Sequence, residues 1–259
     1  MPSDAAATSA TRPAGALYDT IGRGYAARRR PDPRVAARIH AALGDAASVV
    51  NVGAGAGSYE PAGRRVVAVE PSEVMVRQRA PGTAPAVRAT AGALPFRGPS
   101  FDAALASLTL HHWPDWRRGV AEMRRVARRR VVIFTWDPDH PGFWLTTDYF
   151  PTIVPADRAT FPSIGGLADA LGGAEVVPVP IPADCSDGFL GAYWRRPAAY
   201  LDPGVRAAIS AFARIPDPAP ALARLAAELA DGGWERRHGQ HLPADELDLG
   251  YRLVIAELS

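Results

Sequence analysis

Val-Val-Asn-Val-Gly-Ala-Gly-Ala-Gly-Ser at residues 49–58, followed by Val-Val-Ala-Val-Glu at residues 66–70, decides the fold of this chain. The first segment is an apolar strand that runs into glycines at every second position. Glycines directly after a strand let the backbone approach a ligand where a Cβ would clash. The second segment is an apolar strand that ends on Glu70, and a carboxylate at the tip of the next parallel strand can accept both hydroxyls of a ribose. Together the two segments predict a nucleoside-binding pocket.

The spacing of the glycines favours one class of nucleoside cofactor over another. The dinucleotide fingerprint is G-x-G-x-x-G, whereas this chain has G-x-G-x-G, and Ser58 stands where the third dinucleotide glycine would fall. A nicotinamide-dependent oxidoreductase is therefore an alternative that Ser58 disfavours. A tight turn without any ligand is a second alternative, and the position of Glu70 argues against it.

Strands and helices alternate over roughly the first 136 residues. We expect strands at 48–52, 65–70, 86–88, 101–107 and 130–136, and helices over 17–43, with a break at Pro31–Pro33, over 72–79 and over 116–127. This alternation implies right-handed βαβ units and a doubly wound parallel sheet. The arginines at 128–130 are expected at a solvated helix end.

After residue 136 the pattern changes, because residues 137–162 are rich in proline and aromatic residues and have no clear period. We expect a helix at 164–171 and a strand at 175–181, where Pro178 and Pro180 indicate a sheet edge or a bulge. Further helices are expected at 193–201, 203–213 and 218–229, before a closing strand at 247–258. The predicted organisation is one α/β domain over 1–259, with insertions at 137–162 and 183–245 forming a cap.

The amino-acid composition limits the kinds of partner that we expect this protein to bind. The formal net charge is +2, and all 29 basic residues are arginine, which indicates a coding bias more than a basic face for nucleic acid. Cys185 is the single cysteine, so no internal disulfide can form. No apolar run approaches the roughly 20 residues of a membrane helix, and residues 1–11 lack the apolar core of a secretory signal. We expect a soluble, cytoplasmic protein, either a monomer or a homodimer, that binds neither nucleic acid nor membrane.

Four motifs occur in an order typical of one enzyme family: Asn51–Gly57, Val69–Ser72, Ala93–Phe96, and Ser100–Ala103 leading to His111–Trp113. On these motifs the chain resembles the class I S-adenosylmethionine-dependent methyltransferases, in the branch of ubiquinone-biosynthesis-like and small-molecule enzymes. The resemblance covers about residues 48–136. It implies a Rossmann-like sheet of seven strands with the last strand antiparallel, S-adenosyl-L-methionine as cofactor, and methyl transfer to a small organic molecule.

The resemblance also implies which residues surround the cofactor. From the methionine end to the adenine end these are Asn51, Gly53, Ala54 and Gly55 at the glycine turn; Ser107 and Leu108 on the sulfonium side; Glu70 on the ribose; Pro71, Ser72 and Met75 beside the adenine; and Thr90 and Ala91 at its edge. Helices within residues 12–46 would close the site through Tyr18, Tyr25 and Arg30. The chain departs from the family at Asn51, Thr90 and Gly92, where acidic residues are frequent.

Methyl transfer from a sulfonium is an in-line displacement that depends mainly on alignment. A hydroxyl or acidic-carbon acceptor is helped by a general base, most often histidine. His111 and His112 follow a predicted strand at the carboxyl edge of the sheet, where α/β folds bind ligands. One of them is our candidate base; the alternative is that His112 and Trp113 only shape the following loop.

Aromatic residues are dense in the two insertions. Trp136, Trp144, Tyr149, Tyr193 and Trp194 either line an apolar acceptor pocket or form a small core of the insertions themselves. His140 lies among acidic residues without ligand spacing, so we expect no metal. The leading hypothesis is a methyltransferase of specialised metabolism with an O-, N- or C-acceptor, and the alternative is a cofactor-binding protein without turnover.

Overall fold

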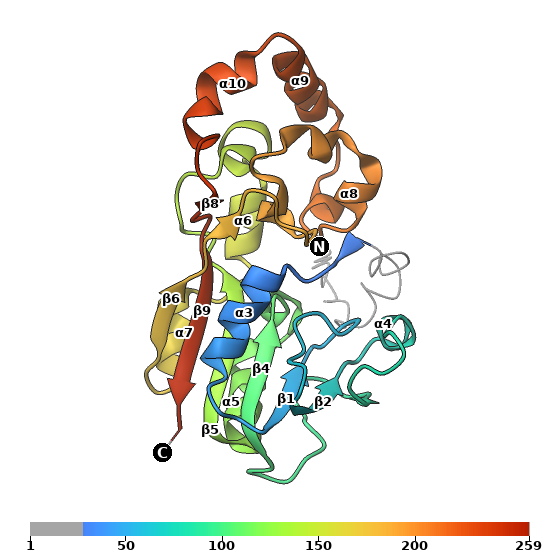
Figure 1. Cartoon of the computed structure of the whole chain (residues 1–259), viewed down its shortest axis with the longest axis vertical. Coiled ribbons are helices and arrows are strands. Elements are labelled where there is room, and N and C mark those ends of the chain that lie inside the picture. Colours follow the sequence, from blue (N-terminus) through green and yellow to red (C-terminus); the bar gives the residue numbers. More distant parts are fainter. Residues whose placement is uncertain (1–27, 259) are drawn as a thin grey trace, which may run out of the picture.

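The computed structural model describes residues 28–258. Its main sheet has seven strands in the order β3-β2-β1-β4-β5-β9-β6 (Figure 1). The five parallel strands are β1 (Ser48–Val52), β2 (Arg65–Val69), β3 (Ala86–Val87), β4 (Phe101–Ser107) and β5 (Ala127–Trp136). β9 (Tyr251–Glu257) runs antiparallel to β5 and to the edge strand β6 (Glu175–Pro178). The predicted seven-stranded sheet with an antiparallel last strand is confirmed.

Helices cover both faces of the sheet because successive strand residues point to opposite sides. Val49 packs on one face with α3 (Pro33–Ala42), and Val50 packs on the other with α5 (Trp116–Val126) and α7 (Ile164–Ala170). The strand β1 is buried at every position, as parallel strands between two helical layers are. This sandwich fixes the carboxyl ends of β1, β2 and β4 relative to one another.

Two helix starts follow the predicted capping residues. Asp32 accepts a hydrogen bond from the backbone N–H of Arg34, and Pro33 occupies the first turn of α3. Ser72 caps α4 (Glu73–Arg77) by accepting from Met75 N, which places the buried Met75 side chain on the inner face of α4. The cap of α4 lies between two of the residues predicted to flank the cofactor, Pro71 and Met75.

The cap, residues 137–162 and 183–245, lies beyond the carboxyl ends of the parallel strands (Figure 1). Its elements are η2 (Leu145–Tyr149), α6 (Ile153–Arg158), η3 (Leu190–Tyr193), η4 (Pro197–Leu201), α8 (Pro203–Ala207), η5 (Phe212–Arg214), α9 (Ala219–Ala230), α10 (Gly233–His238) and η6 (Gly239–His241). A small two-stranded sheet of β7 (Ile181–Pro182) and β8 (Glu246–Leu247) brackets the second insertion.

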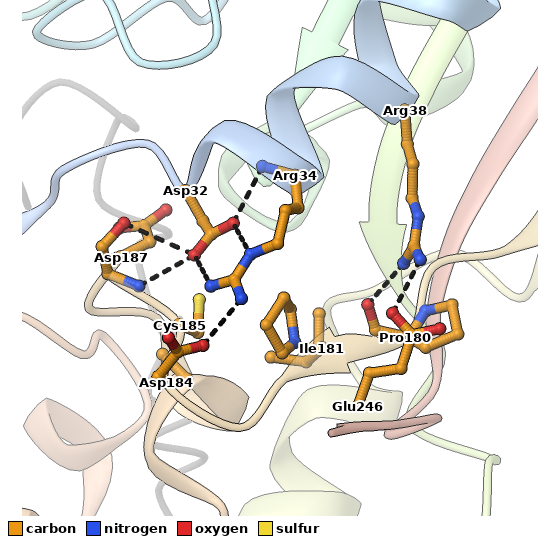
Figure 2. Close-up of polar contacts among 12 residues, drawn as sticks. Asp32, Arg34, Arg38, Pro180, Ile181, Asp184, Cys185, Asp187 and Glu246 are labelled. Atoms are coloured by element: carbon orange, nitrogen blue, oxygen red, sulfur yellow. Dashed lines mark hydrogen bonds and ion pairs between the residues drawn. The ribbon is translucent and has the colours of Figure 1, made fainter. Parts of the chain in front are cut away.

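The start of α3 binds the segment that enters the cap (Figure 2). Asp32 accepts from the Arg34 side chain and from the backbone N–H of Ser186, and Arg34 Nη1 donates to Asp184 Oδ1 at 2.7 Å. Burial acts to raise the pKa of Asp32, but these hydrogen bonds outweigh it and hold the pKa well below its usual value. One turn along, Arg38 donates to the backbone before β7 and to a carboxylate of β8.

Several predicted boundaries are wrong. The arginines at 128–130 lie within β5, which follows α5 without a turn, and not at a helix end. The closing strand begins at residue 251 and not at 247, because Gly250 at φ +87° breaks the chain between β8 and β9. The helix expected at 193–201 is instead the 3-10 helices η3 and η4, and the one at 203–213 is α8 and η5. The edge position that the prolines predicted for β6 is confirmed.

Two predictions concern other parts of the molecule. Tyr18, Tyr25 and most of the expected first helix lie outside the described residues. Within residues 28–258, the helices are too short or too polar to cross a membrane.

Candidate active site

A cavity of about 650 Å³ opens at the carboxyl ends of β1, β2 and β4. It brings together eleven of the residues predicted to surround the cofactor: Asn51, Gly53, Ala54, Gly55, Glu70, Pro71, Met75, Thr90, Ala91, Ser107 and Leu108. We call it the cofactor cavity. Ser72 is buried behind it as the cap of α4 and does not line it. Arg30 is exposed and does not line it either; the neighbouring Arg29 does.

The floor of the cofactor cavity is the glycine turn after β1. The backbone N–H groups of Gly53 and Ala54 both donate to Val69 O, at 2.8 and 3.0 Å, which folds the turn onto the end of β2. Gly53 has φ +70°, and a Cβ there would lie 2.1 Å from Thr109 Oγ1. A side chain at position 53 is therefore excluded both by conformation and by space.

Glu70 is buried, at 6% exposure, and supports this turn from the neighbouring strand. Its Oε2 accepts the backbone N–H of Gly55 at 2.8 Å, and its Oε1 accepts that of Ser72 at 2.9 Å. A carboxylate oxygen accepts more than one hydrogen bond, so this geometry is compatible with binding ribose hydroxyls as well. Glu70 thus stabilises the glycine turn, in addition to its predicted role of binding the ribose.

Two polar atoms beside the cofactor cavity are buried and have no hydrogen-bond partner among residues 28–258. They are Asn51 Oδ1 and Ser107 Oγ, at the ends of β1 and β4. The Asn51 amide nitrogen donates to Glu60 Oε1 at 3.2 Å, and Arg79 pairs with Glu60. Leaving a buried polar atom unsatisfied costs about 1–3 kcal/mol, which indicates that a polar ligand group completes the site. The residues present therefore fit the amino acid end of S-adenosylmethionine.

Arg29, in the segment before α3, is held in place by a buried carboxylate of the cap. Its Nε donates to Asp187 Oδ1 at 2.7 Å, and Tyr59 Oη donates to Asp187 Oδ2 at 2.6 Å. Burial, and then the Asp187 charge, raise the pKa of Tyr59, so its phenol keeps the proton that it donates. Both Arg29 and Tyr59 line the cofactor cavity. We call Arg29, Tyr59 and Asp187 the carboxylate clip.

A second, smaller cavity of about 60 Å³ lies between the sheet and the cap. We call it the cap chamber, and it is lined by Arg29, Leu108, His111, Trp136, Asp157, Phe161, Phe189, Leu190, Ala208, Ile209, Ser210, Ala211, Arg214 and Tyr251. It shares Arg29 and Leu108 with the cofactor cavity. Leu108 has φ +50°, a conformation that is costly for a side chain of this kind and that concentrates at functional sites.

The two predicted histidines divide between the cavities. His112 lines the cofactor cavity and His111 lines the cap chamber, with its ring stacked on Phe161 at a centroid distance of 4.2 Å. Desolvation, together with the charges of Arg214 and Arg29, lowers the pKa of His112 to about 3 and that of His111 well below its usual value. Both imidazoles are therefore neutral near pH 7 and are weak proton acceptors.

The predicted acceptor aromatics separate into two groups. Trp136 lines the cap chamber, with its indole N–H donating to Leu249 O at 2.8 Å. Trp144, Tyr149 and Trp194 are buried in a core of the cap, where Trp144 donates to Trp194 O and packs edge-on against Tyr149. Tyr193 lies under the Arg196 guanidinium and lines neither cavity. Trp144, Tyr149, Tyr193 and Trp194 therefore line neither cavity.

Other lining residues were not predicted. The cofactor cavity includes Trp113, Asp115 and Arg118, and the cap chamber includes Phe189 and Arg214. The first three follow the fourth strand, Trp113 and Asp115 in the loop and Arg118 in the first turn of α5, so their position after a strand of the sheet could have indicated them. Arg214 and Phe189 come from the cap, where no motif or period marked them. Within residues 28–258, no group of three or more His, Cys, Asp or Glu side chains is arranged to hold a metal ion.

Comparisons with known proteins agree with the geometry of the cofactor cavity. A methyltransferase domain family matches residues 50–135. A solved structure from Anabaena variabilis ATCC 29413, of a protein assigned as a methyltransferase of an antibiotic biosynthesis pathway, is 32% identical. It covers 89% of this chain and 99% of its own, with a TM-score of 0.82.

Two other relatives are more distant. The chloroplastic 2-methyl-6-phytyl-1,4-hydroquinone methyltransferase 2 of Oryza sativa subsp. japonica is 40% identical over 53 residues, which are 20% of this chain and only 15% of the rice protein. The cyclase SpnF is 17% identical and covers 94% of both chains with a TM-score of 0.53, which shows a shared fold alone. The cofactor cavity, the sheet topology and the Anabaena relative agree, and the chain belongs to the class I S-adenosylmethionine-dependent methyltransferases.

Proposed function

We propose that this enzyme transfers the methyl group of S-adenosylmethionine to a small organic molecule that lies in the cap chamber. The observation that carries the proposal is that the cofactor cavity and the cap chamber share two residues, Leu108 at the end of β4 and Arg29 from the segment before α3. A methyl donor in one and an acceptor in the other meet at this point, as an in-line displacement requires.

Residues of the chain supply alignment and a dry environment. When bound, S-adenosylmethionine supplies an electrophilic methyl group on a sulfonium. Glu70 would hold the ribose, Asn51 and Ser107 would satisfy the polar amino acid end, and Pro71 and Met75 would flank the adenine. In the cap chamber, Phe161 and Trp136 meet edge-on at 5.8 Å and exclude water from one wall. His111, which lines the cap chamber, would hydrogen-bond the acceptor as a neutral ring.

A role in specialised metabolism is the finer part of the proposal. It is supported by the Anabaena relative, which is assigned to antibiotic biosynthesis and matches over nearly the whole chain. Most of the residues that line the cap chamber also come from the cap, and these lie outside the matched methyltransferase domain at 50–135. The ubiquinone-biosynthesis-like branch stays a prediction. So does a cytoplasmic monomer or homodimer.

The test combines binding with turnover. Purified protein with methyl-labelled S-adenosylmethionine is incubated with a panel of small phenols, amines, carboxylic acids and enols, and product is detected by mass spectrometry. We expect labelled product from at least one class. Cofactor binding without any product across the panel would support the alternative of a binding protein without turnover.

The Glu70→Gln variant tests the cofactor cavity itself. We expect it to weaken S-adenosylhomocysteine binding about tenfold to a hundredfold in calorimetry, because charge-assisted hydrogen bonds to the ribose and to the glycine turn are lost. Glu73→Gln, at the exposed start of α4, is the matched control and should bind within about twofold of the native protein. Equal affinities for the two variants would mean that the ribose contact is misassigned.

A further inference from the structure

The cap chamber holds two guanidinium groups that come from different parts of the chain. Arg29 comes from the segment before α3, and Arg214 ends η5 in the cap. Among the described residues that line the chamber, Asp157 is the one carboxylate, and it pairs with Arg214. Asp187, the partner of Arg29, does not line it. Among the described residues, the lining therefore carries two guanidiniums and one carboxylate, and the Asp187 carboxylate pairs with Arg29 from outside the lining.

Arg214 can donate to a ligand while it keeps its partners. Arg214 is about one-third exposed; its Nη2 donates to Asp157 and its Nη1 reaches Thr160 Oγ1 at 3.4 Å, which uses two of its five N–H donors. Arg29 is fixed by the carboxylate clip with its side chain at 10% exposure. A positioned guanidinium in a mostly dry cavity is the group that proteins use to bind carboxylate and other oxyanions.

The remaining walls of the chamber are apolar and aromatic. Phe161 stacks on His111, and Phe189 leans on Tyr251 at a centroid distance of 4.7 Å. The His111 imidazole adds no positive charge, because desolvation, the neighbouring His112 and the two guanidiniums keep its pKa low. A neutral imidazole beside two cations is a poor general base, so this site is better suited to an acceptor that is already nucleophilic.

We propose that the acceptor enters the cap chamber as an organic anion, with a carboxylate, phenolate or enolate oxygen beside Arg29 and Arg214 and a flat apolar body against Phe161 and Phe189. This inference rests on the proposed function and specifies its substrate class. The electron pair of the anion forms the new bond to the methyl carbon, and the pair of the broken carbon–sulfur bond stays on sulfur. The positive and negative charges cancel in the step, and no proton has to be removed.

Binding of matched probes tests the inference without requiring turnover. The full chain, saturated with S-adenosylhomocysteine, is titrated with benzoate and with its neutral isostere benzamide, and binding is followed by calorimetry. We expect benzoate to bind at least about tenfold more tightly, because a charge-assisted hydrogen bond is worth roughly twice a neutral one. Equal binding, tighter binding of benzamide, or no binding of either probe would overturn the inference.

Variants locate the preference at Arg214. Arg214→Gln should reduce the benzoate preference at least about fivefold, and Arg214→Lys, which keeps the charge but not the planar fork, should reduce it less. Arg214→Gln alone leaves the buried Asp157 carboxylate without its ion-pair partner and could fold poorly for that reason. The double variant Asp157→Asn with Arg214→Gln removes both charges of the pair and avoids this problem. Arg236→Gln, on the exposed outer helix α10, is the control and should bind like the native protein. A full preference in the double variant would refute the role of Arg214.

The two proposals fail separately. If benzoate binds preferentially but no compound of the turnover panel is methylated, the anion site stands and the proposed methyl transfer falls. If a neutral amine is methylated and benzamide binds as well as benzoate, methyl transfer stands and the anionic acceptor falls.

Discussion

Replacing Asp187 with Asn should destabilise the protein and weaken its hold on the cofactor together. The Asp187 side chain is fully buried and accepts from Arg29, from Tyr59 and from the backbone N–H of Gly188 at 2.6 Å. An amide oxygen at this position can still accept from Tyr59, but the substitution removes the negative charge that faces the Arg29 guanidinium, whose side chain is 10% exposed. The carboxylate clip would lose its central charge.

The magnitude follows from burial. Removing one partner of a buried ion pair costs about 3–5 kcal/mol, and the slight exposure of Arg29 puts the expected loss near the lower end, at about 3 kcal/mol. That is a large share of the roughly 5–15 kcal/mol by which a native domain is stable. Because Arg29 and Tyr59 both line the cofactor cavity, we also expect affinity for S-adenosylhomocysteine to fall about tenfold.

Urea unfolding at pH 7 measures the first effect and calorimetry measures the second. Asp184→Asn is the matched control, because Asp184 is 79% exposed and its partner Arg34 is 49% exposed. An exposed pair of this kind is worth under about 1 kcal/mol, so this variant should unfold close to the native midpoint. If Asp187→Asn and Asp184→Asn are equally stable and bind the cofactor alike, the clip does not act as described.

Three further outcomes are expected from other parts of the molecule. Gly53→Ala should abolish S-adenosylhomocysteine binding in calorimetry, whereas Gly63→Ala, at φ +76° with nothing within 4 Å, should keep it, so the comparison isolates the steric clash from the backbone strain. For His112 the folded pKa of about 3 is below the unfolded one, so between pH 6.5 and 3 the unfolded chain binds the proton and the free energy of unfolding falls as the pH drops. His112→Asn should lessen this loss of stability between pH 7 and pH 5 by up to about 2 kcal/mol. The same pH dependence of stability in the variant and in the native protein would contradict this. Asp32 has a lowered folded pKa, so its stabilising effect is present at pH 7 and begins to be lost as the pH falls below the unfolded value of about 3.8. Asp32→Ala should cost about 2–4 kcal/mol at pH 7 and about 1 kcal/mol less at pH 3 in urea unfolding, and an equal cost at both would show that Arg34 does not stabilise the charge.

The cofactor side of the site was predictable because its residues follow strands. A parallel sheet brings the carboxyl ends of its strands to one edge, so the glycine turn after residue 52 and Glu70 had to lie close together once both strands were identified. The same logic placed Ser107 and Leu108 beside them. The sequence patterns there are local, and the parallel topology of the sheet brings them together at one edge.

The cap side was not predictable from patterns because its contacts join distant segments. The hydrogen bond from Tyr59 to Asp187 spans 128 residues and that from Arg29 spans 158, and no periodicity relates these positions. The choice between neighbouring arginines shows the difficulty: the family motif favoured Arg30, but the buried carboxylate holds Arg29 at the cavity. Aromatic density likewise did not separate a lining residue such as Trp136 from a core residue such as Trp144.

The end of β4 explains why the two cavities meet where they do. Leu108 turns into a left-handed conformation directly after the strand while its N–H still bonds Phe134 O at 2.8 Å. This turn costs about 1–2 kcal/mol for a residue with a Cβ. It lets Thr109 fill the space that Gly53 leaves open, with Ser107 beside the cofactor cavity and His111 beside the cap chamber. Glycine at position 108 would relieve the strain, but it would also remove the side chain that lines both cavities. Under the proposed function, the strain at Leu108 serves the junction of methyl donor and acceptor, and not stability.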